Sequence, residues 1–80
     1  MTKEEVIEVI TRNISDNLDD LAEEDVDPTK SMKEYGANSL DIIEVVSSSM
    51  RELNIKIPRS ELADITNIDE LADRFMQHAK

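Results

Sequence analysis

The chain has 80 residues and a formal net charge of −10 at pH 7, because 19 Asp and Glu outnumber nine Lys and Arg. This charge repels nucleic-acid phosphates and anionic membrane surfaces alike, so we expect basic protein surfaces as electrostatic partners and no nucleic acid. The absence of cysteine excludes disulfides, thiolate metal sites and a cysteine nucleophile.

An amphipathic helix is predicted over residues 2–17. Thr2 and Glu5 stand three residues apart, which is the spacing of a reciprocal capping box at a helix start. The apolar positions then recur in steps of three and four, which predicts one buried face formed by Val6, Ile7, Ile10, Ile14 and Leu18.

A long acidic loop follows from Ser15 to Ser31 and contains Pro28, which cannot extend a helix. We expect five side chains to hold this loop and the residues after it against the core: Leu18, Leu21, Val26, Met32 and Tyr35. An EF-hand calcium loop beginning at Asp25 would need glycine in sixth place and glutamate in twelfth. Lys30 and Gly36 stand there, so we expect a solvated acidic surface and no metal site.

The second helix is predicted from Ser39 to about Leu53, with Asn38 as N-cap and Asp41 able to fold back toward it. One face should point into the core: Ile42, Val45, Val46, Ser49 and Leu53. A second, offset face consists of Leu40, Ile43, Ser47 and Met50. It is only partly apolar and less easily buried, and the acidic residues Asp41 and Glu44 lie beside it. This second face is the candidate surface for partner docking.

The remaining chain predicts an extended connector at residues 55–58, a single helical turn within residues 60–64, and a last helix capped by Asn67. The apolar face of that helix should comprise Ile68, Leu71, Ala72, Phe75 and Met76. His78 stands alone in a tail expected to fray, without a catalytic role. The fold class is therefore an all-α bundle of four helices, three longer and one short, in a single domain of residues 1–80.

Ser39 is the most informative residue, because the glycine turn at Gly36 delivers its hydroxyl to the first turn of a helix. An anion attached to that hydroxyl would lie among unpaired helix N–H groups at the positive end of the macrodipole. The position suits a covalently bound phosphodiester. A serine at a helix start is more often only a cap, so this interpretation needs support from the rest of the chain.

That support comes from the order of elements and the motifs they carry, by which the chain resembles the acyl carrier protein family over essentially all of its 80 residues. The family motif Gly-x-Asp-Ser-Leu followed by an acid is matched, except at Asn38, by Gly36, Ser39, Leu40 and Asp41. Three further matches are Glu44 on the same helix, Ile57-Pro58 after it, and Ile65-Thr66 ahead of the last helix.

The resemblance implies a four-helix acyl-carrier-type bundle with a long loop between helices 1 and 2. It also implies that Ser39 receives 4′-phosphopantetheine from coenzyme A through a separate, Mg²⁺-dependent phosphopantetheinyl transferase, making the chain a phosphoprotein. The carrier itself catalyses nothing and holds no metal. Its expected partners are an acyltransferase, a ketosynthase or other acyl-chain enzymes with basic docking surfaces. The residues expected to contact these partners are Asn38, Leu40, Asp41, Ile43, Glu44, Ser47 and Met50.

Asn38 departs from the family, which usually has aspartate there, and it removes one negative charge beside the attachment point. Together with the segment from Asn67 to Leu71, this favours polyketide or related specialised biosynthesis, with fatty-acid synthesis as the competing pathway. The sequence is also compatible with an unmodified acidic adaptor that works by docking alone, and less so with a small calcium-responsive protein. We expect a cytoplasmic protein, because the chain has neither an apolar window of about 18 residues nor a secretory signal. The net charge of −10 predicts a monomer.

Overall fold

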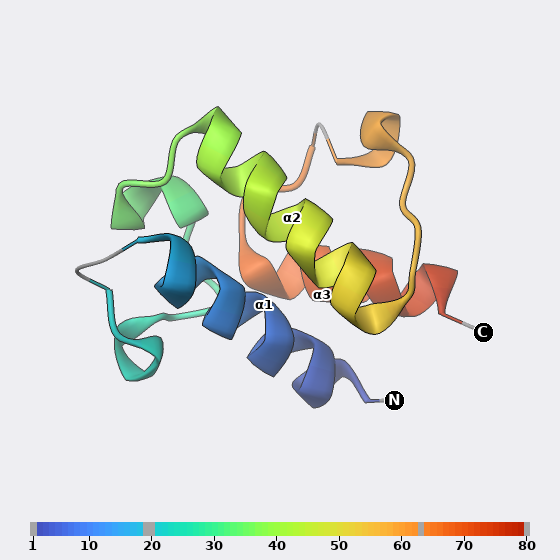
Figure 1. The fold of residues 1–80 in the computed structure, drawn as a ribbon, viewed down its shortest axis with the longest axis horizontal. Helices are drawn as coiled ribbons and strands as arrows, with labels where there is room; N and C mark the ends of the chain where they lie inside the picture. Colours follow the sequence, from blue (N-terminus) through green and yellow to red (C-terminus); the bar gives the residue numbers. More distant parts are fainter. Residues whose placement is uncertain (1, 19–20, 63, 80) are drawn as a thin grey trace.

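Residues 2–18, 21–62 and 64–79 are described by a computed structural model (Figure 1). Within these residues the chain forms three α-helices and no strand: α1 (Lys3–Asn17), α2 (Ser39–Leu53) and α3 (Ile68–His78). The same residues include three short 3₁₀ turns, η1 (Glu23–Asp25), η2 (Met32–Tyr35) and η3 (Arg59–Glu61). The predicted all-α fold, with three longer helices and a long loop between the first two, is confirmed.

The short fourth helix differs in detail from the prediction of one turn within residues 60–64. The structure has the 3₁₀ turn η3 at Arg59–Glu61, directly after Pro58. The Glu61 N–H donates to the Pro58 carbonyl at 3.0 Å, an i to i+3 bond that winds the chain more tightly than an α-helix. Residue 63 of the predicted turn lies outside the described residues.

The core lies where α1 packs against both α2 and α3. Each helix turns its predicted apolar face inward, so the expectation from periodicity is confirmed for all three. The side chains of Phe75, Leu71 and Ile10 are fully buried, while Ile42, Leu53 and Met76 are half-buried and pack against the core. The remaining buried apolar residues are Val6, Ile14, Met32, Ala37, Val45, Val46, Ile55, Ile57, Ile68 and Ala72.

Ser49 is a polar residue within this core, with none of its surface exposed. Its hydroxyl donates to the Val45 carbonyl one turn earlier at 2.8 Å, as serines inside helices commonly do. The same oxygen accepts a hydrogen bond from the Asn13 side chain at 3.0 Å. The hydroxyl is therefore satisfied, and it joins α1 to α2.

The long loop is held in place by backbone hydrogen bonds to the start of α3. The Met32 N–H donates to the Thr66 carbonyl and the Asp69 N–H to the Pro28 carbonyl, both at 2.9 Å. Ser31 and Asn67 form an isolated antiparallel bridge between these two bonds. The predicted anchoring of the loop is confirmed for four of the five side chains, because Met32 is buried and Leu18, Leu21 and Val26 pack on the core. The fifth, Tyr35, is half-buried outside this core, and its hydroxyl accepts from the Asp27 N–H within the loop.

His78 corrects an expectation, since it does not lie in a fraying tail. It is the last residue of α3, and its Nε2 lies 3.0 Å from Oε2 of Glu61 in η3. Arg74, one turn earlier on α3, also contacts the Glu61 carboxylate, at 3.2 Å. The single carboxylate of Glu61 therefore fastens η3 to the end of α3, a long-range contact that no local pattern could indicate.

Candidate functional site

The geometry around Ser39 begins with Gly36, which ends η2 in the left-handed conformation at φ +87°. Glycine adopts this conformation without the strain that a Cβ atom would add. The buried Ala37 then fixes the chain to the core, and Asn38 begins the next helix in an extended conformation. Ser39 is consequently the first residue of α2, and its side chain is exposed to solvent.

The start of α2 is secured by a complete capping box, as predicted. The Asn38 side-chain oxygen accepts from the Asp41 N–H at 2.9 Å, while Oδ2 of Asp41 accepts from the Asn38 N–H at 3.1 Å. The other carboxylate oxygen, Oδ1, accepts from the Asn17 side chain at the end of α1 at 3.1 Å. Both carboxylate oxygens of Asp41 thus accept hydrogen bonds within the fold, which makes Asp41 chiefly a positioning residue for Ser39.

Two backbone donors remain beside the Ser39 hydroxyl. In the first turn of α2 the Asp41 N–H is capped and the Ile42 N–H donates to the Asn38 carbonyl at 3.0 Å. Among the described residues, no hydrogen bond is found for the N–H groups of Ser39 and Leu40. Unpaired N–H groups at a helix start are suitable ligands for a phosphodiester, so the residues present fit a phosphate group attached to Ser39.

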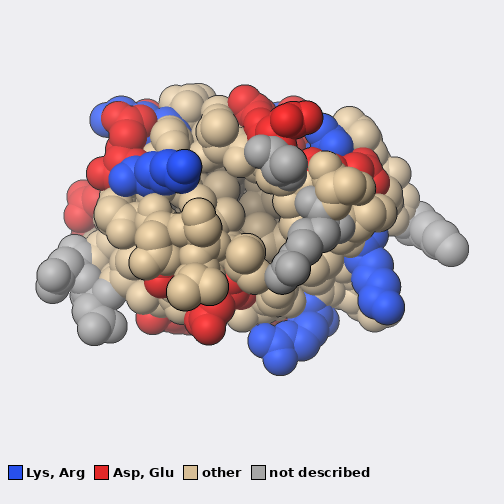
Figure 2. Space-filling model, turned by 90° about the horizontal axis from the view of Figure 1, so that it is seen from above, with Lys and Arg blue, Asp and Glu red and all other residues tan. Residues whose placement is uncertain are grey.

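A groove leads away from Ser39 along α2 and has a cavity volume of about 480 Å³. One wall is the α2 face bearing Ile43, Val46 and Met50, and the opposite wall comes from the region of η3. Figure 2 looks onto this end of the molecule from above and shows a hollow within a mostly uncharged area. The complete lining is Lys33, Ser39, Ile42, Ile43, Val46, Ser47, Met50, Ile57, Leu62 and Ile65.

The predicted partner residues fall into two groups around this groove. Leu40 is 73% exposed and stands on the outer surface of α2 with the exposed Asn38 and Glu44. Ile43, which is 40% exposed, lies at the groove together with the half-buried Ser47 and Met50. The second face of α2 is therefore accessible as predicted, and the binding of partners there stays a prediction.

Some residues of the site were not predicted from the sequence. Lys33 lines the same groove as Ser39, and Asn17 contacts Asp41 from another helix. Ile57, Leu62 and Ile65 form the far wall of the groove. The capping sequence Ser31 to Glu34, which forms a complete capping box at η2, was a local signal that could have placed Lys33 in a turn next to the site.

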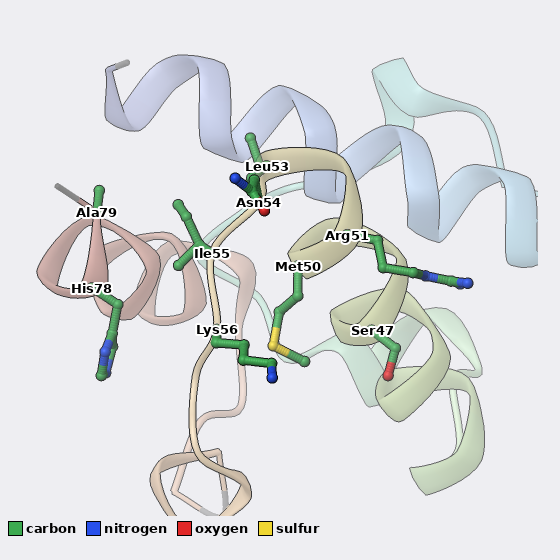
Figure 3. Close-up of a pocket in the computed structure, with 9 residues that line it drawn as sticks. All are labelled: Ser47, Met50, Arg51, Leu53, Asn54, Ile55, Lys56, His78 and Ala79. Atoms are coloured by element: carbon green, nitrogen blue, oxygen red, sulfur yellow. The ribbon is translucent and has the colours of Figure 1, made fainter.

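A second, wider groove of about 980 Å³ opens beyond Met50, between the C-terminal ends of α2 and α3 (Figure 3). It shares Ser47 and Met50 with the first groove, so the two grooves adjoin at these residues. Three of its residues carry basic side chains, Arg51, Lys56 and His78, although the chain as a whole is acidic. The remaining lining is Leu53, Asn54, Ile55 and Ala79.

The basic side chains of this second groove differ in what they contact. His78 is engaged by Glu61, and the hydrogen bonds from His78 and Arg74 hold the pKa of the Glu61 carboxyl below its ordinary value. Arg51 and Lys56 are exposed, and the ion pairs found among the described residues include neither of them. Neither charge is therefore neutralised by an ion pair within the described residues.

Neither a cluster of metal ligands nor a membrane-spanning helix is found in the described parts of the chain. Within residues 2–18, 21–62 and 64–79, no three His, Asp or Glu side chains gather closely enough to hold a metal ion. In the same ranges, no helix has the length and apolar character needed to cross a membrane.

Comparison with known proteins matches residues 8–75 to the family described as the phosphopantetheine attachment site. A polyketide biosynthesis acyl carrier protein of Bacillus subtilis, AcpK, is 37% identical over 73 residues, covering 91% of this chain and 89% of the relative. The acyl carrier protein of Rubrobacter xylanophilus is 30% identical over 79 residues, covering 98% and 96%. A carrier chain from the crystal structure of the curacin biosynthetic pathway HMG synthase in complex with acetyl donor-ACP is 38% identical, with a TM-score of 0.85 and full coverage of both chains.

Proposed function

Since the chain belongs to the acyl carrier protein family, whose members carry a covalently attached 4′-phosphopantetheine, we propose that the Ser39 hydroxyl is its attachment site. Ser39 is the residue in the family motif, it is exposed, and it opens α2. The single observation that carries the proposal is the pair of unpaired N–H groups, of Ser39 and Leu40, beside that hydroxyl. When attached, the arm supplies the thiol that this cysteine-free chain lacks.

The residues around Ser39 then have separate tasks. In the transfer, the Ser39 oxygen bonds to the phosphorus that bears the pantetheine, the pyrophosphate P–O bond of coenzyme A breaks to release adenosine 3′,5′-bisphosphate, and the serine proton passes to a base of the transferase. The N–H groups of Ser39 and Leu40 stabilise the phosphodiester charge, and Lys33, which lines the same groove, adds a positive charge on that side. Asn38 and Asp41 keep the start of α2 in the geometry that presents the hydroxyl. The chain performs no catalysis in this scheme, since carriers of this family are generally substrates of their partner enzymes.

Partner enzymes dock on the exposed half of α2, in our proposal. Leu40 and Ile43 supply apolar contact, and Glu44 supplies charge for a basic surface on a transferase, acyltransferase or ketosynthase. Ser47 and Met50 extend this surface along the groove. Charge complementarity raises the encounter rate and selectivity more than the affinity, which suits a carrier that must dissociate after each transfer.

The pathway we propose is polyketide or related specialised acyl-chain biosynthesis, served by a single domain of residues 1–80. The 37% identity to the polyketide carrier of Bacillus subtilis supports it, as does the resemblance to a carrier bound to an HMG synthase. The description of that complex favours a more specific role, the delivery of acetyl groups to an HMG synthase. Fatty-acid synthesis is the competing pathway, and a cytoplasmic location stays a prediction from the sequence.

The test is the intact mass of the chain after incubation with coenzyme A, Mg²⁺ and a broad-specificity phosphopantetheinyl transferase. We expect a gain of one phosphopantetheinyl group, its loss in Ser39→Ala, and its retention in Ser48→Ala, a matched serine on the same helix. A folded protein that gains no mass, even as Asn38→Asp, would favour the unmodified acidic adaptor instead.

A further inference from the structure

The distance from Ser39 to Met50, where the two grooves adjoin, can be compared with the length of the phosphopantetheine arm. An α-helix rises 1.5 Å per residue, so Met50 lies about 16 Å along α2 from Ser39. The arm has about fourteen bonds between the serine oxygen and the sulfur, and an extended chain gains 3.3–3.6 Å for every three bonds, or about 16 Å in total. An arm lying in the first groove would therefore bring its thioester to Met50, where the second groove begins.

Lys56 is the charged residue nearest to this junction in the view of Figure 3. Its side chain points toward Met50, and Ser47 lies one helical turn earlier on α2, while Arg51 is directed away on the other side. The Lys56 side chain is exposed, and the ion pairs within the described parts of the chain do not include it. An ammonium group outside these ion pairs therefore lies near the expected place of the acyl group, in a chain with 19 acidic residues.

Among the other charged side chains of the second groove, His78 is bound by Glu61, whereas Arg51 is in no ion pair found among the described residues and points away from the junction (Figure 3). Glu61 is bound by His78 and Arg74, and Glu52 pairs with Arg12 of α1. Met50 and Ile55 line the second groove with apolar surface, which a few methylene groups of an acyl chain can contact. An anionic group that reached the junction would therefore meet the Lys56 ammonium on one side of Met50, and the Ser47 hydroxyl lines the groove on the other side (Figure 3).

We propose that the junction of the two grooves is a binding site for short acyl groups that end in a carboxylate, with Lys56 as the residue that contacts the carboxylate. This inference rests on the proposed attachment of the arm at Ser39. Neutral acyl groups of the same size would gain only apolar contact with Met50 and would leave the groove more readily. The carrier would thus distinguish its cargo by charge before any enzyme does.

The test compares two nearly isosteric acyl groups on the arm, malonyl with a carboxylate and acetoacetyl with a methyl ketone. A phosphopantetheinyl transferase loads each from its coenzyme A thioester, and the intact mass reports the loading. Amide ¹H–¹⁵N spectra then report binding at Ser47, Met50 and Lys56. We expect the malonyl form to populate the groove about 1.4- to 5-fold more, the range for an exposed ion pair, and to lose this advantage in 0.5 M NaCl.

Lys56→Gln should abolish the difference between the two loaded forms, whereas Lys30→Gln on the long loop should leave it intact. Equal shifts for both acyl groups, or an unchanged difference in Lys56→Gln, would overturn the inference while the proposed function stands. Failure of loading at Ser39, seen in the mass, would overturn both. Groove shifts produced only by an added acidic peptide and not by either acyl group would assign these charges to a partner protein and also overturn the inference.

Discussion

Replacing Asn38 with alanine is expected to destabilise the protein, because Asn38 caps the helix that presents Ser39. The substitution removes the acceptor of the Asp41 N–H but keeps the bond from the residue 38 N–H to the Asp41 carboxylate. Loss of an asparagine N-cap costs about 0.5–2 kcal/mol, and we expect about 1 kcal/mol here because half of the capping box survives. In a domain of this size that loss lowers Tm by about 4–8 °C.

Asn38→Asp is the matched substitution, because aspartate caps a helix about as well as asparagine. The added charge interacts favourably with the helix start by about 0.3–1 kcal/mol, and repulsion from the adjacent Asp41 carboxylate opposes it. We therefore expect the free energy of unfolding to change by no more than about 0.5 kcal/mol.

Urea unfolding followed by far-UV circular dichroism measures both changes, because the chain has no tryptophan for fluorescence. A fully stable Asn38→Ala, or an Asn38→Asp that loses more than about 1 kcal/mol, would refute the assignment of this residue as an interchangeable cap. The same two variants separate the effect of residue 38 on stability from its effect on recognition by the transferase. Asn38→Asp should be modified faster by a transferase that prefers an acidic motif, whereas Asn38→Ala should not.

Three further predictions concern other parts of the fold. Gly36→Ala should cost about 1–2 kcal/mol in urea unfolding from backbone strain alone, since its φ is +87° and no atom lies within 4 Å of an added Cβ. A loss near zero would contradict the left-handed turn. The lowered pKa of Glu61 contributes stability that is complete above its ordinary value of 4.5 and is lost as the pH falls through the lowered value. Glu61→Gln should therefore flatten the acid limb of a plot of Tm against pH, which the exposed-site control Glu24→Gln should leave unchanged. Glu44→Lys should slow acyl transfer by a partner enzyme at low salt with little change in Tm, and unchanged kinetics would remove Glu44 from the docking surface.

The sequence predicted those parts of the fold that depend on local patterns. The helix bounds follow from caps at Thr2, Asn38 and Asn67, each of which accepts the expected backbone N–H. At Thr2 the predicted reciprocal capping box was wrong in detail. The Glu5 carboxylate accepts from the Thr2 hydroxyl, at 3.3 Å, and not from the Thr2 backbone N–H. η3 was placed one residue too late, since the proline before it starts the turn at once.

The site was predictable only as far as its residues lie on one element. Periodicity along α2 separated the buried Val45 and Val46 from the exposed Leu40 and Ile43. The far wall of the groove and the contacts of Asn17 and His78 join segments that are distant in sequence. Such contacts depend on how the helices pack against one another, and a single sequence carries no direct record of this packing.

The hydrogen bonds between the long loop and the start of α3 have a consequence for the order of events during synthesis. Ser31 pairs with Asn67, which is 36 residues later (67 − 31), and at about 5–20 residues per second the ribosome needs roughly 2–7 s to add that stretch. The capping box at Asn38 is local and can form soon after its residues emerge. Residues 28–32 must wait for their partners, so the nascent chain would display its modification motif while the loop before it is still unordered.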